Sequence, residues 1–152
     1  MKTHTPRRLT ILLADDDEDD RLMTREALVE SQFDGVLHCV EDGEEAMNYL
    51  HRAGAYNASN APRPDILLLD LNMPRKDGRE VLREMKADKL LRRIPVIVLT
   101  TSKAEEDILR TYDLGVNSFI TKPISFEGLV DVMRTLGDYW VKTVQLPSSQ
   151  DR

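Results

Sequence analysis

Four stretches of this sequence end in side chains suited to phosphate chemistry. The apolar stretch LTILLA is followed by six acids, Asp15 to Asp20. Asp70 follows ILLL, Thr100 follows VIVL, and Lys122 follows FIT. Mg²⁺ prefers hard oxygen ligands such as carboxylates and phosphate oxygens. A lysine neutralises a phosphoryl group as a point charge, and a hydroxyl can donate to one of its oxygens.

Converging carboxylates require a counter-charge if they are to stay ionised. Close carboxylates raise one another's pKa, and a divalent cation removes that repulsion. We therefore predict that Asp15, Asp16 and Asp70 bind Mg²⁺. A carboxylate beside such a metal can act as a nucleophile and form an aspartyl phosphate. Phosphoryl transfer of this kind depends on positioning and charge neutralisation more than on acid–base chemistry.

The elements that must position these side chains follow from the hydrophobic pattern. Short runs rich in Ile, Val and Leu alternate with longer amphipathic stretches. Such runs are typical of parallel strands that are covered on both faces, and the alternation predicts an α/β fold with a parallel sheet. We expect strands over 9–14, 36–40, 65–71, 94–100 and 117–122. We expect helices over 18–31, from 42, around 81–85, from 102, and over 126–144.

The chemistry-bearing residues fall at the carboxyl ends of those strands, where ligands bind in open α/β sheets. The first strand ends at Asp15 and Asp16, and the third at Asp70. Asp17 to Asp20 overlap the start of the first helix, and we assign them to that helix because its dipole favours acids there. Glu41 and Asp42 follow the second strand, and Asp42 with Glu45 has the spacing of a capping box.

Composition excludes several function classes. The net charge is −6, which disfavours sequence-independent binding to nucleic acid. The single cysteine, Cys39, allows no disulfide within the chain. No apolar run approaches the length of a membrane span, and no signal peptide is found. We therefore expect a cytoplasmic protein without a membrane segment or a nucleic-acid partner.

The motifs LLADD, LLLDLNMPRKDG, IPVIVLTT and FITKP resemble the receiver domain of two-component response regulators. The resemblance covers roughly residues 9 to 140, with the motifs in the right order. It implies a flavodoxin-like (βα)5 fold, doubly wound, with a five-stranded parallel sheet in the order 2-1-3-4-5. We expect an N-terminal arm over 1–8, the receiver over 9–144, and a flexible tail over 145–152.

The resemblance also implies roles for individual residues. Asp70 matches the aspartate that accepts a phosphoryl group from a histidine kinase. Asp15 and Asp16 match the acidic pair that binds Mg²⁺, and the backbone carbonyl of Asn72 matches the one that completes the metal site. Lys122 matches the lysine that contacts the phosphoryl group. Such a protein catalyses only its own phosphorylation and dephosphorylation, and it is not otherwise an enzyme.

Further positions match the parts of a receiver that respond to phosphorylation. Thr100 matches the switch hydroxyl, and Phe119 falls where the family has a switch aromatic, often Tyr. Gly78, at the end of MPRKDG, would permit an unusual backbone turn. The Lys122–Pro123 peptide is often cis in the family.

The sequence is most similar to single-domain regulators paired with bacterial and cyanobacterial phytochrome histidine kinases. Residues RPDILLLDLNMPRKDGREVL, RIPVIVLTTS and YWVKTVQLP carry this second resemblance. It implies a histidine kinase partner such as a bacteriophytochrome, and signalling through protein contacts. We also expect a homodimer through the face formed by the fourth helix, fifth strand and fifth helix, with Tyr139, Trp140 and Val144 in the interface.

Two other functions use parts of the same pattern. A haloacid-dehalogenase-type phosphatase has an aspartate nucleophile and Mg²⁺, but it needs a second aspartate two residues later, where this chain has Asn72. A pseudo-receiver binds partners without phosphorylation and lacks one or more of the key residues. Asp16, Asp70 and Lys122 are all present.

Overall fold

The computed structural model describes residues 8–100, 115–116, 118–123 and 125–138. Five strands form one parallel sheet in the order β2-β1-β3-β4-β5, which confirms the expected flavodoxin-like topology. The strands are β1 (Leu9–Ala14), β2 (Gly35–Val40), β3 (Ile66–Leu69), β4 (Val96–Thr100) and β5 (Ser118–Thr121). The described helices are α1 (Glu18–Glu30), α2 (Gly43–His51), α3 (Gly78–Ala87), the short 3-10 helix η1 (Leu91–Arg93) and α5 (Phe126–Gly137).

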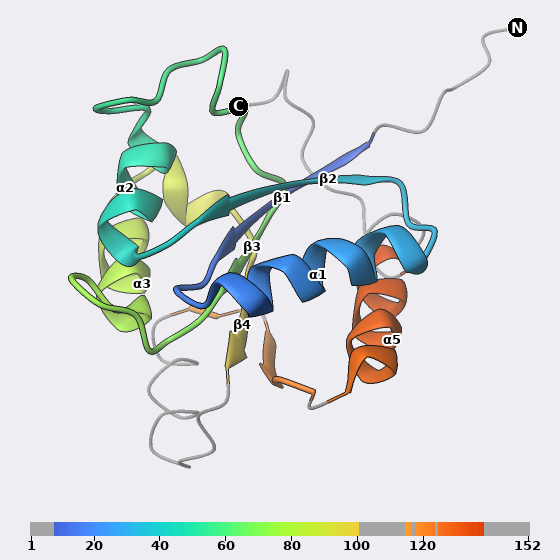
Figure 1. Cartoon of the computed structure of the whole chain (residues 1–152). Helices are drawn as coiled ribbons and strands as arrows, with labels where there is room; N and C mark the ends of the chain where they lie inside the picture. Colours follow the sequence, from blue (N-terminus) through green and yellow to red (C-terminus); the bar gives the residue numbers. More distant parts are fainter. Residues whose placement is uncertain (1–7, 101–114, 117, 124, 139–152) are drawn as a thin grey trace, which may run out of the picture.

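Helices cover both faces of the sheet, with α2 and α3 on one side and α1 and α5 on the other (Figure 1). Successive β1 residues point to opposite faces, so the strand contributes to two separate hydrophobic clusters. Leu12 and Ala14 belong to the cluster beneath α2 and α3. Ile11 and Leu13 belong to the cluster beneath α1 and α5. Burial on both faces explains why the strand reads as an unbroken apolar run.

Acid or hydroxyl side chains cap the described α-helices at their N-termini. Asp17 accepts from two backbone N–H groups at the start of α1, and Asp77 and Ser125 cap α3 and α5. Asp42 caps α2 by accepting from the N–H of Glu45, as predicted. The return bond differs from a capping box, because the Glu45 carboxylate accepts from the N–H of Glu41 at 2.6 Å.

The third strand is shorter than the predicted 65–71. Asp65 precedes it, and its buried carboxylate accepts from the N–H of Thr10 at 2.9 Å. Asp70 and Leu71 lie beyond its carboxyl end. The predicted fourth helix and the residues after 138 lie outside the described residues, as do the predicted tail and most of the predicted arm. None of the described helices combines the length and apolar character that a membrane span requires.

Candidate functional site

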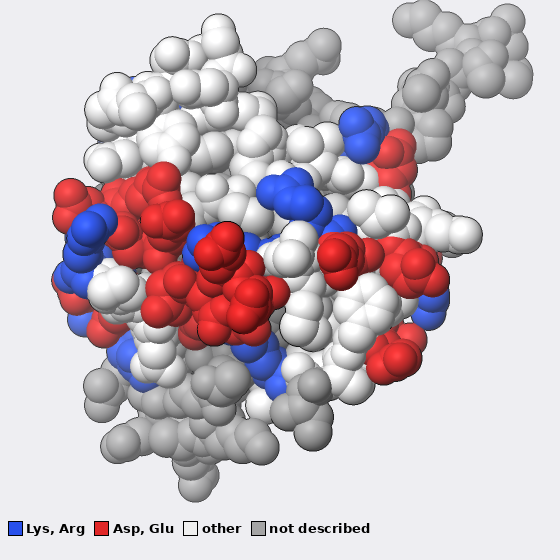
Figure 2. Space-filling view, viewed as in Figure 1, with Lys and Arg blue, Asp and Glu red and all other residues white. Residues whose placement is uncertain are grey.

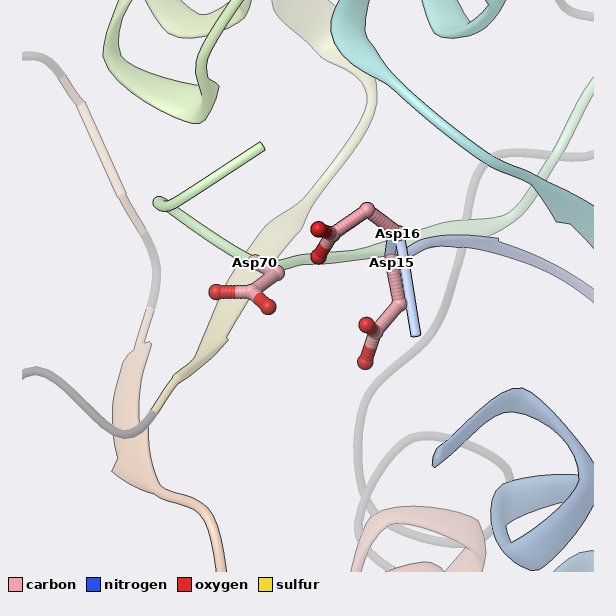
Figure 3. Close-up of side chains that lie close together, drawn as sticks. All are labelled: Asp15, Asp16 and Asp70. Atoms are coloured by element: carbon pink, nitrogen blue, oxygen red, sulfur yellow. The ribbon is translucent and has the colours of Figure 1, made fainter. Parts of the chain in front are cut away.

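The acidic site forms where β1 and β3 end side by side. Ala14 and Leu69 are register partners at the end of this pair, and the N–H of Asp70 donates to the carbonyl of Ala14 at 3.0 Å. Asp15 and Asp70 therefore leave adjacent strands at the same level. Figure 3 shows their carboxylates together with that of Asp16. One ligand oxygen from each of the three lies within 4.8 Å of the other two.

The three carboxylates have different environments. Asp15 is 1% exposed and Asp70 is 7% exposed, whereas Asp16 is exposed to solvent. Burial raises the pKa of Asp15, and its hydrogen bond from Lys122 opposes that rise. The remaining oxygen of Asp15 accepts from the N–H of Asp17 at 3.0 Å. Asp16 can therefore reach a solvated ion, while Asp15 and Asp70 form the buried side of the site.

Lys122 brings a positive charge to the same point from the end of β5. Thr121 pairs with Thr100 at the end of β4, so Lys122 leaves the sheet one residue beyond that level. Its Nζ lies 2.7 Å from Asp15 Oδ2 and 3.3 Å from Asp70 Oδ2. Burial by itself lowers the pKa of Lys122, but hydrogen bonds to Asp15 and Asp20 raise it overall. The side chain therefore stays protonated and acts as a fixed cation.

The sequence analysis missed Asp20, which is part of this site. We assigned it to the start of α1, yet its Oδ2 lies 2.7 Å from Lys122 Nζ. Asp20 lies in the first turn of α1, as predicted, and Asp17 is the N-cap; the bond to Lys122 is a second role that the sequence analysis did not foresee. Arg21, also unassigned, donates from Nη1 to the backbone carbonyl of Asp15 at 2.8 Å. The sequence did hold one indication of these contacts: only three residues separate β1 from α1, so the first turn of α1 must begin beside the carboxyl end of β1.

The loop after Asp70 is held close to the site. The N–H of Asn72 donates to Asp70 Oδ1 at 3.2 Å, and the Asn72 side chain is exposed. The unusual backbone conformation is at Arg75, with φ of 67°, and not at Gly78 as predicted. Gly78 is needed for a different reason: a Cβ there would lie 2.5 Å from the carbonyl oxygen of Asp70.

Some of the remaining predicted site residues lie within the described part of the chain, and others lie outside it. The backbone of Thr100 closes β4, and Phe119 on β5 is half-buried against the cluster beneath α2 and α3. The Lys122–Pro123 peptide is trans, in contrast to the expectation from the family. Tyr139, Trp140 and Val144 lie outside the described residues.

Glu41 and Asp42 do not join the acidic group. Asp42 caps α2 and accepts from Arg75 Nη1 at 2.9 Å, and Glu41 lies 3.6 Å from Arg21 Nη2. Within the described chain, the carboxylates that could share a cation are those of Asp15, Asp16 and Asp70. These donors are all hard oxygens, which fits Mg²⁺ or Mn²⁺. The ammonium beside them suits a phosphoryl oxygen.

Comparison with known proteins agrees with this geometry. The chain is 43% identical over 139 residues to response regulator Rcp1 of Synechocystis sp., covering 91% of this chain and 93% of Rcp1. It resembles the crystal structure of the phosphorylated cyanobacterial phytochrome response regulator RcpA, with a TM-score of 0.85 and 46% identity over 93% of this chain and all of RcpA.

A second solved structure, the Mn²⁺-bound form of Rcp1, aligns with a TM-score of 0.82 at 43% identity, over 92% of this chain and 99% of Rcp1. The sequence model of the family "Response regulator receiver domain" matches residues 11–134. Fold, carboxylate group and sequence therefore agree, and this chain belongs to the response regulator receiver domain family.

Proposed function

We propose that this receiver accepts a phosphoryl group on Asp70 from a histidine kinase, in a reaction that requires Mg²⁺. One observation carries the assignment: the Asp70 carboxylate lies both in the three-carboxylate group and 3.3 Å from Lys122 Nζ. Phosphorylation on aspartate is general to the receiver family. In the transfer, an Asp70 oxygen forms a bond to phosphorus while the phosphorus–nitrogen bond of the phosphohistidine breaks.

The residues around Asp70 have separate roles in this proposal. Asp15, Asp16, Asp70 and the Asn72 carbonyl would hold Mg²⁺, which neutralises charge on the transferred group when bound. Lys122 donates to a phosphoryl oxygen from the other side, and its raised pKa keeps it charged. Thr100 would supply a hydroxyl, and Thr100 and Phe119 would report the change to the surface. The chain catalyses only its own phosphorylation and dephosphorylation.

The relatives support a proposal for the partner. RcpA is described as a phytochrome response regulator, so we propose that the kinase here is of the phytochrome type. Such a kinase would use ATP, so we propose that the transfer takes place in the cytoplasm. We further propose that the protein acts through protein contacts as a homodimer whose interface includes Tyr139, Trp140 and Val144. The acidic balance argues against a nucleic-acid partner.

Incubation with acetyl phosphate and Mg²⁺, followed by intact mass measurement, tests the Asp70 assignment. Wild type should gain one phosphoryl group, and Asp70→Asn should gain none because the amide is not a nucleophile. Asp19→Asn, an exposed acid on the first turn of α1, is the control and should be labelled like wild type. Labelling of Asp70→Asn at the wild-type rate would contradict the assignment.

The same experiment separates the two other functions. A phosphatase would turn over acetyl phosphate without accumulating the phosphorylated form, and a pseudo-receiver would neither turn over nor become labelled. Stable labelling of wild type that is lost on removal of Mg²⁺ is the result expected for a receiver.

A further inference from the structure

The Lys122 ammonium contacts three carboxylates, although its proposed role requires only that it lie beside Asp70. Its three N–H groups have acceptors in Asp15 and Asp20, each at 2.7 Å, and in Asp70 at 3.3 Å. The side chains of Lys122 and Asp15 are 13% and 1% exposed, so the bond between them is largely shielded from water, whereas the Asp20 side chain is 37% exposed and approaches Lys122 from the solvent side. Hydrogen bonds between ionised partners are among the strong ones in proteins.

Two of these three carboxylates have a second use. Asp15 and Asp70 belong to the group whose oxygens could share a cation, together with Asp16. A divalent cation there and the Lys122 ammonium draw on the same two carboxylates, so they compete. Among the described acids that contact Lys122, Asp20 alone lies outside the metal group.

Asp20 is also not needed to cap its helix. The N-cap of α1 is Asp17, whose Oδ1 accepts from the N–H groups of Asp19 at 2.8 Å and Asp20 at 3.1 Å. Asp19 has the same charge and lies in the same first turn, and it is exposed. The helix dipole therefore acts on both residues alike. The feature specific to Asp20 is its bond to Lys122.

We propose that Asp20 is a positioning residue that holds the Lys122 ammonium beside the site while Asp15 and Asp70 bind the metal. This inference rests on the proposed Mg²⁺ site. Without the Asp20 carboxylate, Lys122 turns more fully to Asp15 and Asp70 and competes with Mg²⁺ for them. Asp20 thereby raises the affinity of the site for Mg²⁺ through Lys122, and it keeps the ammonium within reach of a phosphoryl group on Asp70.

Titration of Mg²⁺ into the full chain by isothermal calorimetry tests this role. Asp20→Asn should raise the Kd for Mg²⁺ by about three- to tenfold, the range expected for coupled neighbouring groups. Asp19→Asn removes the same charge from the same turn and should change the Kd by less than about twofold. Circular dichroism with EDTA verifies that both variants are folded. Equal changes in the two variants would overturn the inference.

A double-mutant cycle tests whether Asp20 acts through Lys122. Lys122→Met keeps an apolar stem and removes the charge, so Asp20→Asn in that background should behave like Asp19→Asn. An undiminished effect of Asp20→Asn in the Lys122→Met background would overturn the role of Lys122. If wild type does not bind Mg²⁺, both the proposed metal site and this inference are overturned. If Asp19→Asn and Asp20→Asn change the Kd for Mg²⁺ equally, only this inference is overturned.

Discussion

Lys122 is the residue on which the charge balance of the site depends. Asp15, Asp20 and Asp70 carry three negative charges into a small volume, and one ammonium lies among them. Its raised pKa excludes a role as general base near neutral pH, because it does not release its proton there. We therefore propose that it contributes a fixed positive charge beside Asp70.

Tyr49 gives a residue-scale prediction about pH. It is 3% exposed, and its hydroxyl donates to the carbonyl of Pro62 at 2.7 Å. Burial raises the pKa of Tyr49 to about 12 from its ordinary value of 10.0. The folded state therefore holds this proton more tightly than the unfolded state does. The stabilisation is fully present below pH 10 and is lost as the pH rises toward 12.

Urea unfolding at several pH values between 9 and 12 measures this effect. The loss attributable to Tyr49 is at most about 2–3 kcal/mol over the window, since each pKa unit corresponds to about 1.4 kcal/mol. Tyr49→Phe should be less stable near neutral pH, through the lost hydrogen bond, yet show a shallower decline above pH 10. Parallel curves for wild type and variant would contradict the assignment.

At the scale of elements, hydrophobic runs predicted the strands well because burial on both faces leaves little other choice of residue. The limits of β3 were less predictable, because Asp65 donates its N–H to the Thr10 carbonyl as a strand residue would, while the Thr10 N–H is bound by the Asp65 carboxylate and not by a backbone carbonyl. Asp20 was correctly placed at the start of α1, but its bond to Lys122 was not foreseen, because it joins residues 102 positions apart. Strand-end chemistry is readable from sequence, but contacts between a helix turn and a distant strand end are not.

The loop after Asp70 is fixed against the start of α2. Arg75 pairs with the Asp42 carboxylate, which is 7% exposed as a side chain, and Lys76 forms an ion pair with Glu84. Gly43 at the first position of α2 lies against the backbone of Lys76, and a Cβ there would overlap the Lys76 carbonyl oxygen. Since backbone cannot move aside as a flexible side chain can, the fit depends on glycine.

Gly43→Ala should therefore destabilise the fold and disturb the loop that follows Asp70. We expect a loss of about 1–3 kcal/mol in the free energy of unfolding, the range for overpacked positions. Phosphorylation by acetyl phosphate should also slow, because Lys76 and Asn72 share this loop. Glu44→Ala, an exposed neighbour on α2, is the control and should change both quantities less. A Gly43→Ala variant as stable and as reactive as wild type would show that the loop adapts freely.

At the scale of the whole molecule, the site depends on the strand order. The order β2-β1-β3-β4-β5 places β1 beside β3 at the centre, so acids from two distant segments meet, and Lys122 reaches them from the edge strand β5. Figure 2 shows Asp and Glu side chains gathered where α1 begins and over α2. An acidic surface of this kind would suit a partner with a basic surface.

The homodimer is the prediction that concerns the whole molecule. The strand order leaves β5 at one edge of the sheet, with Ser118, Phe119 and Ile120 half-buried. The apolar stripe of α5 buries Leu129, Val130 and Met133 against the sheet. From sequence we expect this stripe to continue to Trp140 and Val144, beyond the described residues. Aromatic anchors beside a sheet edge suit a two-fold contact between identical chains.

Gel filtration coupled to light scattering, at tens of micromolar protein, measures the mass in solution and so tests whether the protein is a homodimer. Wild type should have roughly twice the 17.4 kDa mass of one chain, and Trp140→Ala should shift toward the monomer because a central aromatic contact is lost. Leu22→Ala on α1 is the control: Leu22 is 55% exposed but lies on another helix, so its loss should leave the dimer intact. A wild-type mass near one chain, with and without phosphorylation, would remove the dimer. A dimer that persists in Trp140→Ala would instead remove Trp140 from the interface.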